Sequence, residues 1–279
     1  MSQETFAEDP QPELPAAFCD PVHVAEIAEM AAPPPLPEPA TSEPELPAHK
    51  PWRPKRLVRT CLSSMADSDT FGAQMQREAQ GRRFFEATAR AFLGDGLPWN
   101  WSIWKQHFRK FTPILDFIHV LAYLYAAAVT MHEDFSAAWN CYLEMARACW
   151  QGRVADVIER LNDWLTERGV SGDMKLEESD PRLAVSDAAR YLNNNRSRMD
   201  YPSYRRQGMP VTTALMESLV KQINARVKGT EMFWNDPAGA EAILQVRAAA
   251  LCDDGRLATF LANRQGCRYV RRSSLAIAA

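Results

Sequence analysis

Two aspartates stand directly after short apolar segments, where a folded chain could place them for chemistry. Asp95 lies between Gly94 and Gly96 and follows the apolar run at 91–93. A carboxylate at the end of a strand is rigidly held, and its oxygens are the ligands that Mg²⁺ prefers. The alternative is a turn aspartate that accepts hydrogen bonds from its own backbone. Asp95 is therefore a candidate metal ligand or a turn residue.

Asp116 ends the next apolar segment, at 112–116, and His119 follows it three residues later. The two side chains could be ligands of one metal ion. They could also form a hydrogen bond that supports a neighbouring ligand. Asp116 could instead cap the helix that begins after it. The sequence leaves these three interpretations open.

A third acidic candidate, Glu217, lies in the first turns of a helix predicted at 211–227, for which Thr212 or Thr213 is the expected cap. Steps of four, three and four residues place four polar residues on one face: Glu217, Lys221, Asn224 and Lys228. An acid that heads a basic face suits a metal ligand beside a phosphate-binding surface. The alternative is a solvated helix face with a Glu–Lys pair.

Positive charge is concentrated between residues 190 and 230. This stretch, called the basic stretch below, holds eight basic residues against Asp200 and Glu217: Arg190, Arg196, Arg198, Arg205, Arg206, Lys221, Arg226 and Lys228. Three tyrosines are interleaved with them: Tyr191, Tyr201 and Tyr204. Arginine and lysine bind phosphates, and tyrosine stacks on bases. The alternative is a solvated loop with structural tyrosines. The nearby Trp99, Trp101 and Trp104 are better explained as core or surface-anchoring aromatics.

The elements around these residues alternate in type between residues 55 and 116. Strands are predicted at 55–64, 91–93 and 112–116, with helices at 69–83 and 98–110 between them. This order favours a parallel α/β layer. Helical periodicity then dominates from 117 to about 200, with breaks near His132, Gly152 and 169–180. Two more helices are predicted at 236–250 and 253–265.

Charge and proline are unevenly distributed along the 279 residues. Residues 1–49 carry ten Asp or Glu and no Lys or Arg, which leaves 32 basic and 25 acidic residues, a net charge of +7, in the remainder. Thirteen of the nineteen prolines lie in the first 54 residues. The sequence therefore predicts an acidic, largely disordered leader at 1–50, with a short helix at 22–30, ahead of a body that can meet a polyanion.

Several protein classes are disfavoured by what the sequence contains. The six cysteines form no C-x-x-C pair, which argues against a zinc site or a disulfide framework and for reduced thiols in the cytoplasm. No apolar signal segment is found near Met1. The apolar run at 114–131 contains Asp116 and His119, so a buried helix is favoured over a membrane span. Phosphate-binding glycine loops, G-x-S-x-G and H-E-x-x-H are absent from the sequence.

Three stretches, taken together, resemble one family. They are FLGDGLPWNWSIWKQHF at 92–108, ILDFIHVLAYL at 114–124, and YLNNNRSRMDYPSYRRQGMPVTTALMESLVKQINARVKGTEMFW at 191–234. Their order and spacing are similar to the catalytic half of DDE-type transposases of bacterial insertion sequences. The most similar branch is the Kra-type group, which is related to Mutator-like elements. The resemblance covers roughly residues 52–265.

The resemblance implies a ribonuclease-H-like α/β core with a large helical insertion. The core would begin at 51–119, the insertion would occupy 120–205, and the catalytic glutamate helix and C-terminal helices would fill 206–279. By resemblance, Asp95 is the second catalytic carboxylate and Glu217 the third, and both would ligate Mg²⁺ or Mn²⁺. Asp116 and His119 match a supporting D-x-x-H motif.

The chain departs from the family at its first catalytic carboxylate, which belongs on the central strand of the sheet. Asp9 and Asp20 precede Trp52, but they lie in proline-rich sequence that is poor strand material. We therefore expect a partial copy that lacks the first strands and the first aspartate. Metal-dependent cleavage would then be weakened, because the coordination geometry is part of the catalysis.

The implied function is DNA transposition by metal-dependent phosphoryl transfer, with double-stranded DNA at the element ends as substrate. The chain is expected to form homo-oligomers or to pair with intact transposase, in the bacterial cytoplasm at the nucleoid. The candidate DNA-binding residues are Arg196, Arg198, Arg205, Arg206, Lys221, Arg226 and Lys228. One alternative is a non-catalytic DNA-binding remnant that interferes with intact transposase. Another is a helical scaffold whose basic stretch meets a different acidic partner.

Overall fold

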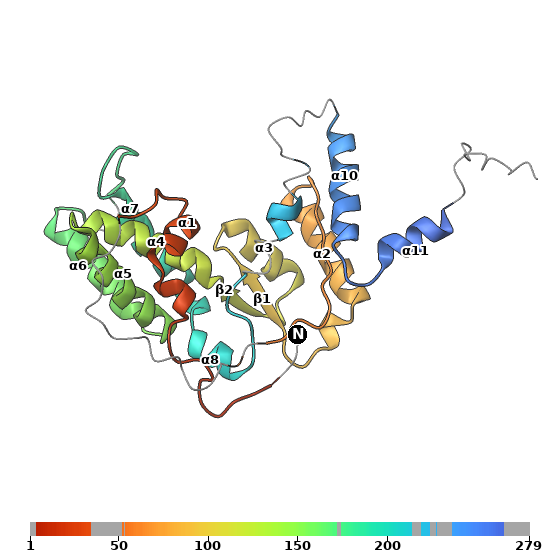
Figure 1. Ribbon diagram of the computed structural model, residues 1–279, viewed down its shortest axis with the longest axis horizontal. Helices are drawn as coiled ribbons and strands as arrows, with labels where there is room; N and C mark the ends of the chain where they lie inside the picture. Colours follow the sequence, from red (N-terminus) through yellow and green to blue (C-terminus); the bar gives the residue numbers. More distant parts are fainter. Residues whose placement is uncertain are drawn as a thin grey trace, which may run out of the picture. The chain divides into compact units, whose positions relative to one another are not determined.

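The computed structural model describes residues 4–34, 52, 54–171, 174–213, 219–223, 227 and 236–264, which are coloured along the chain in Figure 1. The chain forms two compact units. The first unit comprises Met1–Arg56 and Ala66–Glu217, and the second comprises Leu57–Met65 and Ser218–Ala279. The described part is mostly helical and contains one small sheet.

The sheet has two parallel strands, β1 (Ala91–Gly94) and β2 (Thr112–Leu115), in the register Ala91 opposite Thr112 through Gly94 opposite Leu115. Helix α3 (Pro98–His107) joins them, with Pro98 at its first position, where a missing N–H costs nothing. The strands predicted at 91–93 and 112–116 are confirmed. Parallel strands need such a crossover, so the order of these three elements follows from the sequence.

The strand predicted at 55–64 is wrong, because the described residues 54–64 form no strand. Their hydrogen bonds go instead to helix α10 (Pro237–Ala250) and to the residues that follow it. Asp253 N donates to Arg59 O at 2.8 Å, and Arg59 N donates to the Asp253 carboxylate at 2.9 Å. Of the apolar side chains in this segment, Cys61 is buried in the second unit, whereas Leu57, Val58 and Leu62 are exposed.

Helix α2 (Ser68–Gly81) packs against α3, and its N-cap is Asp67, which accepts a hydrogen bond from Thr70 N at 2.8 Å. A 3₁₀ turn, η2 (Phe84–Glu86), follows it. These elements enclose a small aromatic core formed by Ala79, Phe92, Ile103, Phe108 and Phe111. Through Phe92, this core packs against strand β1.

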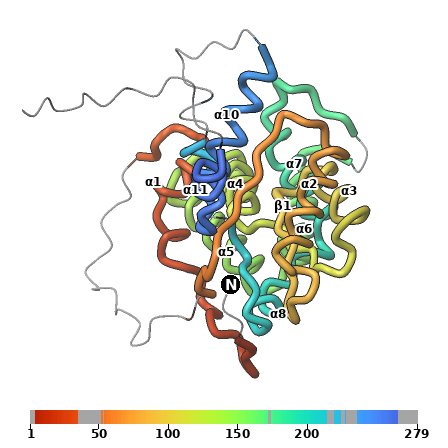
Figure 2. The backbone as a smooth tube through the Cα atoms, turned by 90° about the vertical axis from the view of Figure 1, so that its right-hand side faces the viewer, coloured from red at the N-terminus to blue at the C-terminus, as the bar shows by residue number. Residues whose placement is uncertain are grey.

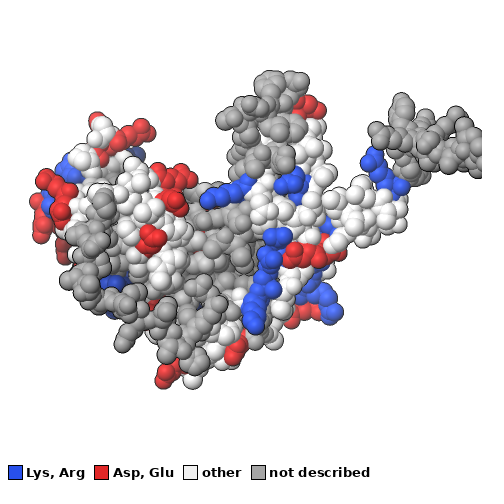
Figure 3. Space-filling model, in the orientation of Figure 1, with Lys and Arg blue, Asp and Glu red and all other residues white. Residues whose placement is uncertain are grey.

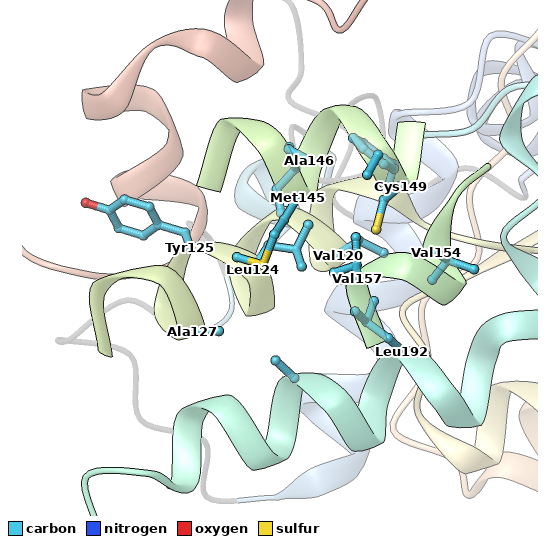
Figure 4. Close-up of a cluster of buried hydrophobic side chains, with 14 of the residues drawn as sticks. Val120, Leu124, Tyr125, Ala127, Met145, Ala146, Cys149, Val154, Val157 and Leu192 are labelled. Atoms are coloured by element: carbon cyan, nitrogen blue, oxygen red, sulfur yellow. The ribbon is translucent and has the colours of Figure 1, made fainter. Parts of the chain in front are cut away.

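Four helices form a helical block: α4 (Phe117–Met131), α5 (Phe135–Trp150), α6 (Val154–Glu167) and α7 (Leu183–Asn195). Figure 4 shows side chains from all four converging in the main core. Helix α4 is apolar on nearly all sides because it is buried at the centre, in contact with α1, α5 and α7. Among the described residues, none of the helices is both long and apolar enough to cross a bilayer.

The helix ends in this block match the predicted breaks. Helix α4 ends at His132, and Gly152 turns the chain with a φ of +81° between α5 and α6. After α7, a 3₁₀ turn η3 (Arg196–Arg198) and a short helix α8 (Tyr201–Arg206) carry the first half of the basic stretch. In the part that the structure describes, residues 120–205 are therefore mostly helical, with a non-helical segment between α6 and α7.

The leader differs from the expectation of disorder, because residues 4–34 pack against the helical block. A 3₁₀ turn, η1 (Ala16–Cys19), and helix α1 (Pro21–Ile27) lie beside α4 (Figures 1 and 2). Phe18, Val24 and Ala25 are buried in the main core. Burial of these few apolar residues holds the leader against the block despite its acidic, proline-rich composition. Residues 35–50 lie outside the described part.

The second unit is built from residues 57–65, helix α10 (Pro237–Ala250) and helix α11 (Arg256–Asn263), close to the helices predicted at 236–250 and 253–265. Its small core contains Cys61, Leu219 and Ala248. Of the helix predicted at 211–227, residues 211–213 are not helical, whereas 219–223 and 227 are. The predicted helix start is therefore wrong for residues 211–213.

Candidate active site at the sheet edge

The candidate site lies where the two strands end, called the sheet edge below. Gly94 is opposite Leu115 in the register, so Asp95 and Asp116 leave the sheet side by side. Asp116 N donates to Gly94 O at 2.9 Å, which extends the ladder by one bond. In open α/β sheets, ligands bind beyond the carboxyl ends of the strands. The fold thus brings together two acids that are twenty-one positions apart in the sequence.

Asp95 forms the turn that the sequence suggested. Its Oδ1 accepts hydrogen bonds from Leu97 N at 2.9 Å and from Asn100 Nδ2 at 2.6 Å. Both bonds go to the same oxygen, and Oδ2 accepts none from the part of the chain that the structure describes. The turn and ligand interpretations are therefore compatible, since one oxygen fixes the side chain and the other can face a cation.

Asp116 is completely buried, and its carboxylate is surrounded by donors. It caps α4 by accepting a hydrogen bond from Ile118 N at 3.3 Å, as one of the sequence interpretations required. It also accepts hydrogen bonds from Thr213 N at 2.9 Å and from the Thr213 hydroxyl. Its Oδ2 lies 2.8 Å from His119 Nδ1. Asp116 therefore links three segments of the chain.

His119 is held by this carboxylate, while 43% of its side chain is exposed. When the imidazole is neutral, the hydrogen bond to Asp116 places the proton on Nδ1 and leaves the lone pair on Nε2. A histidine oriented in this way can donate to or accept from a polar ligand at the sheet edge.

Tyr191 supports the turn at Asp95 through a hydrogen bond to its backbone. Its hydroxyl donates to Asp95 O at 2.8 Å, and its ring stacks on Tyr123 with centroids 4.0 Å apart. Burial raises the pKa of Tyr191, and Tyr123, Asp116 and Asp95 push it in the same direction. The phenol therefore stays protonated as a donor. Gly96 has a φ of +96°, and a Cβ there would lie 2.5 Å from the Tyr191 ring, so only glycine fits.

The tyrosines of the basic stretch serve the structure in this way rather than stacking on bases. Tyr201 is fully buried and donates to Leu115 O at 3.1 Å, and Tyr204 is 7% exposed. Trp104 is likewise internal, since its Nε1 donates to Phe111 O at 2.8 Å. Trp99, by contrast, is 42% exposed. The interleaving of aromatic and basic residues in the sequence does not distinguish buried structural aromatics from exposed ones.

The arginines predicted to bind DNA fall into different environments. Arg196 and Arg206 are exposed. Arg198 is half-buried, its guanidinium lies 4.3 Å from the centre of the Trp101 ring, and burial lowers its pKa. Lys221 is exposed in the second unit. Arg226, Lys228 and Glu217 lie outside the described residues, so the structure does not place them.

The prediction that Arg205 contacts DNA is corrected, because the side chain is buried and hydrogen-bonded inside the first unit. Only 4% of the residue is exposed. Its guanidinium binds the Asp9 carboxylate at 2.5 and 2.9 Å, donates to Trp150 O at 2.9 Å, and lies 4.1 Å from the centre of the Trp150 ring. An arginine in this environment joins the leader to the helical block. It is not placed to contact DNA.

The described residues contain no group of three or more His, Cys, Asp or Glu side chains that could hold a metal ion. Glu217 lies outside the described residues, so the structure does not place it. The Asp95 Oδ2 and a glutamate would supply oxygen ligands of the kind that suit Mg²⁺.

Comparisons with known proteins returned no match of the chain to a protein-family model, a curated protein or a solved structure. The transposase resemblance therefore rests on the three sequence stretches given above. The function proposed below depends on the geometry of the sheet edge.

Proposed function

We propose that the chain acts on DNA by metal-dependent phosphoryl transfer, as a DDE-type transposase or a partial copy of one, on a ribonuclease-H-like core. The observation that carries this proposal is the geometry of the sheet edge. The strand register places Asp95 beside Asp116, and Asp116 binds Thr213, which leads into the Glu217 segment. Asp95 and Asp116 thus follow adjacent parallel strands, and Thr213 contacts Asp116 from a distant part of the sequence, which supports the proposal.

The residues at the sheet edge would have separate roles. Asp95 binds through its Oδ2, because Oδ1 is occupied by Leu97 and Asn100. Glu217 supplies the second carboxylate. Mg²⁺ or Mn²⁺ bound there would activate the attacking hydroxyl and neutralise charge on the phosphate. His119 presents its ring to a phosphate oxygen, while exposed Arg196 and Arg206 hold the DNA backbone.

The first catalytic carboxylate, which the resemblance puts on the central strand, is not found on the described strands. Within the described residues, Asp95 and Asp116 are the acids that directly follow a strand, and Asp116 is already surrounded by donors. This observation favours the second candidate function, DNA binding without cleavage. In that case the chain would interfere with an intact transposase by occupying its DNA or by pairing with it.

The two candidates are separated by incubating the full chain with supercoiled DNA and either Mn²⁺ or Mg²⁺. The proposal predicts slow nicking that Asp95→Asn reduces at least about 100-fold, as expected when an essential metal ligand is lost. The control is Asp163→Asn, at an exposed aspartate on α6, which should nick like the wild type. DNA binding without nicking would support the second candidate, and absence of both would contradict each.

A further inference from the structure

We propose that Cys61 and Cys252 are a redox-active pair that closes reversibly into a disulfide within the second unit. Both are free thiols in the structure, and both belong to the second unit although 191 positions separate them in the sequence. The spacing of the cysteines along the sequence gives no sign of this pair, because the fold alone brings them together. The assignment does not depend on the function proposed above.

The backbone on both sides of the pair holds the two cysteines near each other. Arg59 N donates to the Asp253 carboxylate at 2.9 Å, and Asp253 N donates to Arg59 O at 2.8 Å. The Arg59 side chain also donates to Leu251 O at 2.8 Å. Arg59 is thus bound to the residues on either side of Cys252, and Cys61 is only two positions further along the chain.

The sulfur atoms lie against each other's backbone. Cys252 Sγ accepts a hydrogen bond from Cys61 N at 3.1 Å and lies 3.7 Å from Cys61 O. Cys61 Sγ lies 3.8 Å from Leu251 O, the carbonyl oxygen directly before Cys252. Disulfides join residues whose Cα atoms are about 4.4–6.8 Å apart. Contact of a sulfur with its partner's backbone puts the Cα atoms in this range or close to it, so a change of side-chain rotamer can form the bond.

Exposure differs between the two thiols and sets the order of the reaction. Cys61 is 8% exposed, and burial raises its pKa, with the neighbouring Cys252 thiol acting in the same direction. Its thiol therefore stays protonated and shielded while the protein is reduced. Cys252 is half-buried, so a small-molecule disulfide meets this thiol first.

The oxidant is a small-molecule disulfide such as oxidised glutathione, and the reaction has two steps. Cys252 loses its proton and attacks the glutathione disulfide, which forms a mixed disulfide and releases one glutathione thiolate. Cys61 then loses its proton and attacks the Cys252 sulfur, which forms the protein disulfide and releases the second thiolate. Both protons pass through solvent to the released thiolates. The protein loses two electrons, and the glutathione disulfide gains them.

The bond would tie residues 57–65 to the end of helix α10. The core of the second unit is small, with Cys61, Leu219 and Ala248 as its buried residues. A covalent link across a long stretch of sequence restricts the unfolded chain strongly. Oxidation should therefore make this unit more resistant to local opening, and reduction should reverse the effect.

The first test maps disulfides in the full wild-type chain. The protein is equilibrated without oxygen in mixtures of reduced and oxidised glutathione, its remaining thiols are blocked, and its peptides are identified by mass spectrometry. We expect the peptide that joins Cys61 to Cys252 as the main disulfide, at ratios where Cys19, which is also half-buried, stays reduced. A glutathione adduct on Cys252 without the cross-link, or preferential pairing of Cys252 with another cysteine, would overturn the proposal.

The second test measures hydrogen exchange of the backbone amides of Arg59, Cys61 and Asp253 in the reduced and oxidised full chain. Oxidation should slow their exchange at least about tenfold in the wild type and in the control Cys19→Ser. Cys252→Ser should show neither the cross-link nor the slowing. Equal exchange in the reduced and oxidised wild type would overturn the stiffening of the unit, and slowing that persists in Cys252→Ser would overturn the assignment of the pair.

Discussion

At the residue scale, two aspartates with the same position after a strand are used differently. Asp95 keeps an oxygen that accepts no hydrogen bond from the described residues, whereas Asp116 is buried and surrounded by four donors. The sequence could suggest a turn for the first and a cap for the second, and both are confirmed. It could not reveal Thr213 as a partner of Asp116, because that contact joins residues 97 positions apart.

This difference predicts that the same substitution, Asp to Asn, lowers stability much more at position 116 than at position 95. Asp116→Asn removes the charge and sets an amide donor against other donors, so it should lower the free energy of unfolding by about 3 kcal/mol. Asp95→Asn keeps the Oδ1 acceptor of the turn and should change it by less than about 1 kcal/mol. Urea unfolding of the full chain measures both. A larger loss for Asp95→Asn than for Asp116→Asn would contradict these roles.

At the element scale, the periodic elements were predicted well and the leader was not. Aspartate caps mark the starts of helices α2, α4 and α5, so these starts follow from local sequence. The leader buries few residues, and its docking depends on distant groups. Trp150 Nε1 donates to Gln11 O at 2.9 Å, and Tyr142 OH donates to Phe18 O at 3.0 Å. Composition alone cannot anticipate such contacts.

The ion pair of Asp9 with Arg205 predicts a pH-dependent attachment of the leader. Burial tends to raise the pKa of Asp9, but hydrogen bonds from Arg205 and Gln11 N and the charges of Arg205 and Arg206 outweigh it and leave the pKa below 3.8. A lowered pKa in the folded state means that the charged form stabilises folding above the unfolded value, and this contribution is lost as pH falls through the folded value.

The substitution Asp9→Asn should therefore lower the free energy of unfolding by about 2 kcal/mol at pH 7, because a charged hydrogen-bonded partner of a buried arginine is removed. The gap between wild type and variant should shrink below pH 3.8, the ordinary value for this carboxyl. Urea unfolding from pH 7 to pH 3 tests this. A matched control is Glu13→Gln, at an exposed leader carboxylate. A gap independent of pH would contradict the account.

At the scale of the whole molecule, the net charge of the body overstates its capacity to bind DNA. Arg205 is neutralised by the leader, and helix α6 exposes Asp156, Glu159, Asp163 and Glu167. On the face drawn in Figure 3, the helical block accordingly shows more Asp and Glu than Lys and Arg. Contact with DNA through the first unit should therefore use η3 and α8, which carry exposed Arg196 and Arg206, and not α6.

Salt dependence of DNA affinity tests this distribution of charge. Each phosphate contact contributes about 0.9 to the slope of log affinity against log salt concentration, so Arg196→Ala with Arg206→Ala should reduce the slope by about 2. Arg160→Ala, on the acidic helix α6, serves as the control and should leave the slope unchanged. An equal reduction by the control would place the DNA elsewhere, and a flat slope for wild type would favour the scaffold alternative.

Metal-directed cleavage of the protein itself tests whether the sheet edge holds a divalent metal at Asp95. Fe²⁺ with ascorbate and peroxide cuts a backbone next to the bound ion, and mass spectrometry locates the cuts. We expect cuts close to Asp95 and close to Asp116 in the wild type and in Asp163→Asn. Excess Mg²⁺ should suppress these cuts, and Asp95→Asn should abolish them. Cuts that persist in Asp95→Asn, or that occur only elsewhere in the chain, would contradict it.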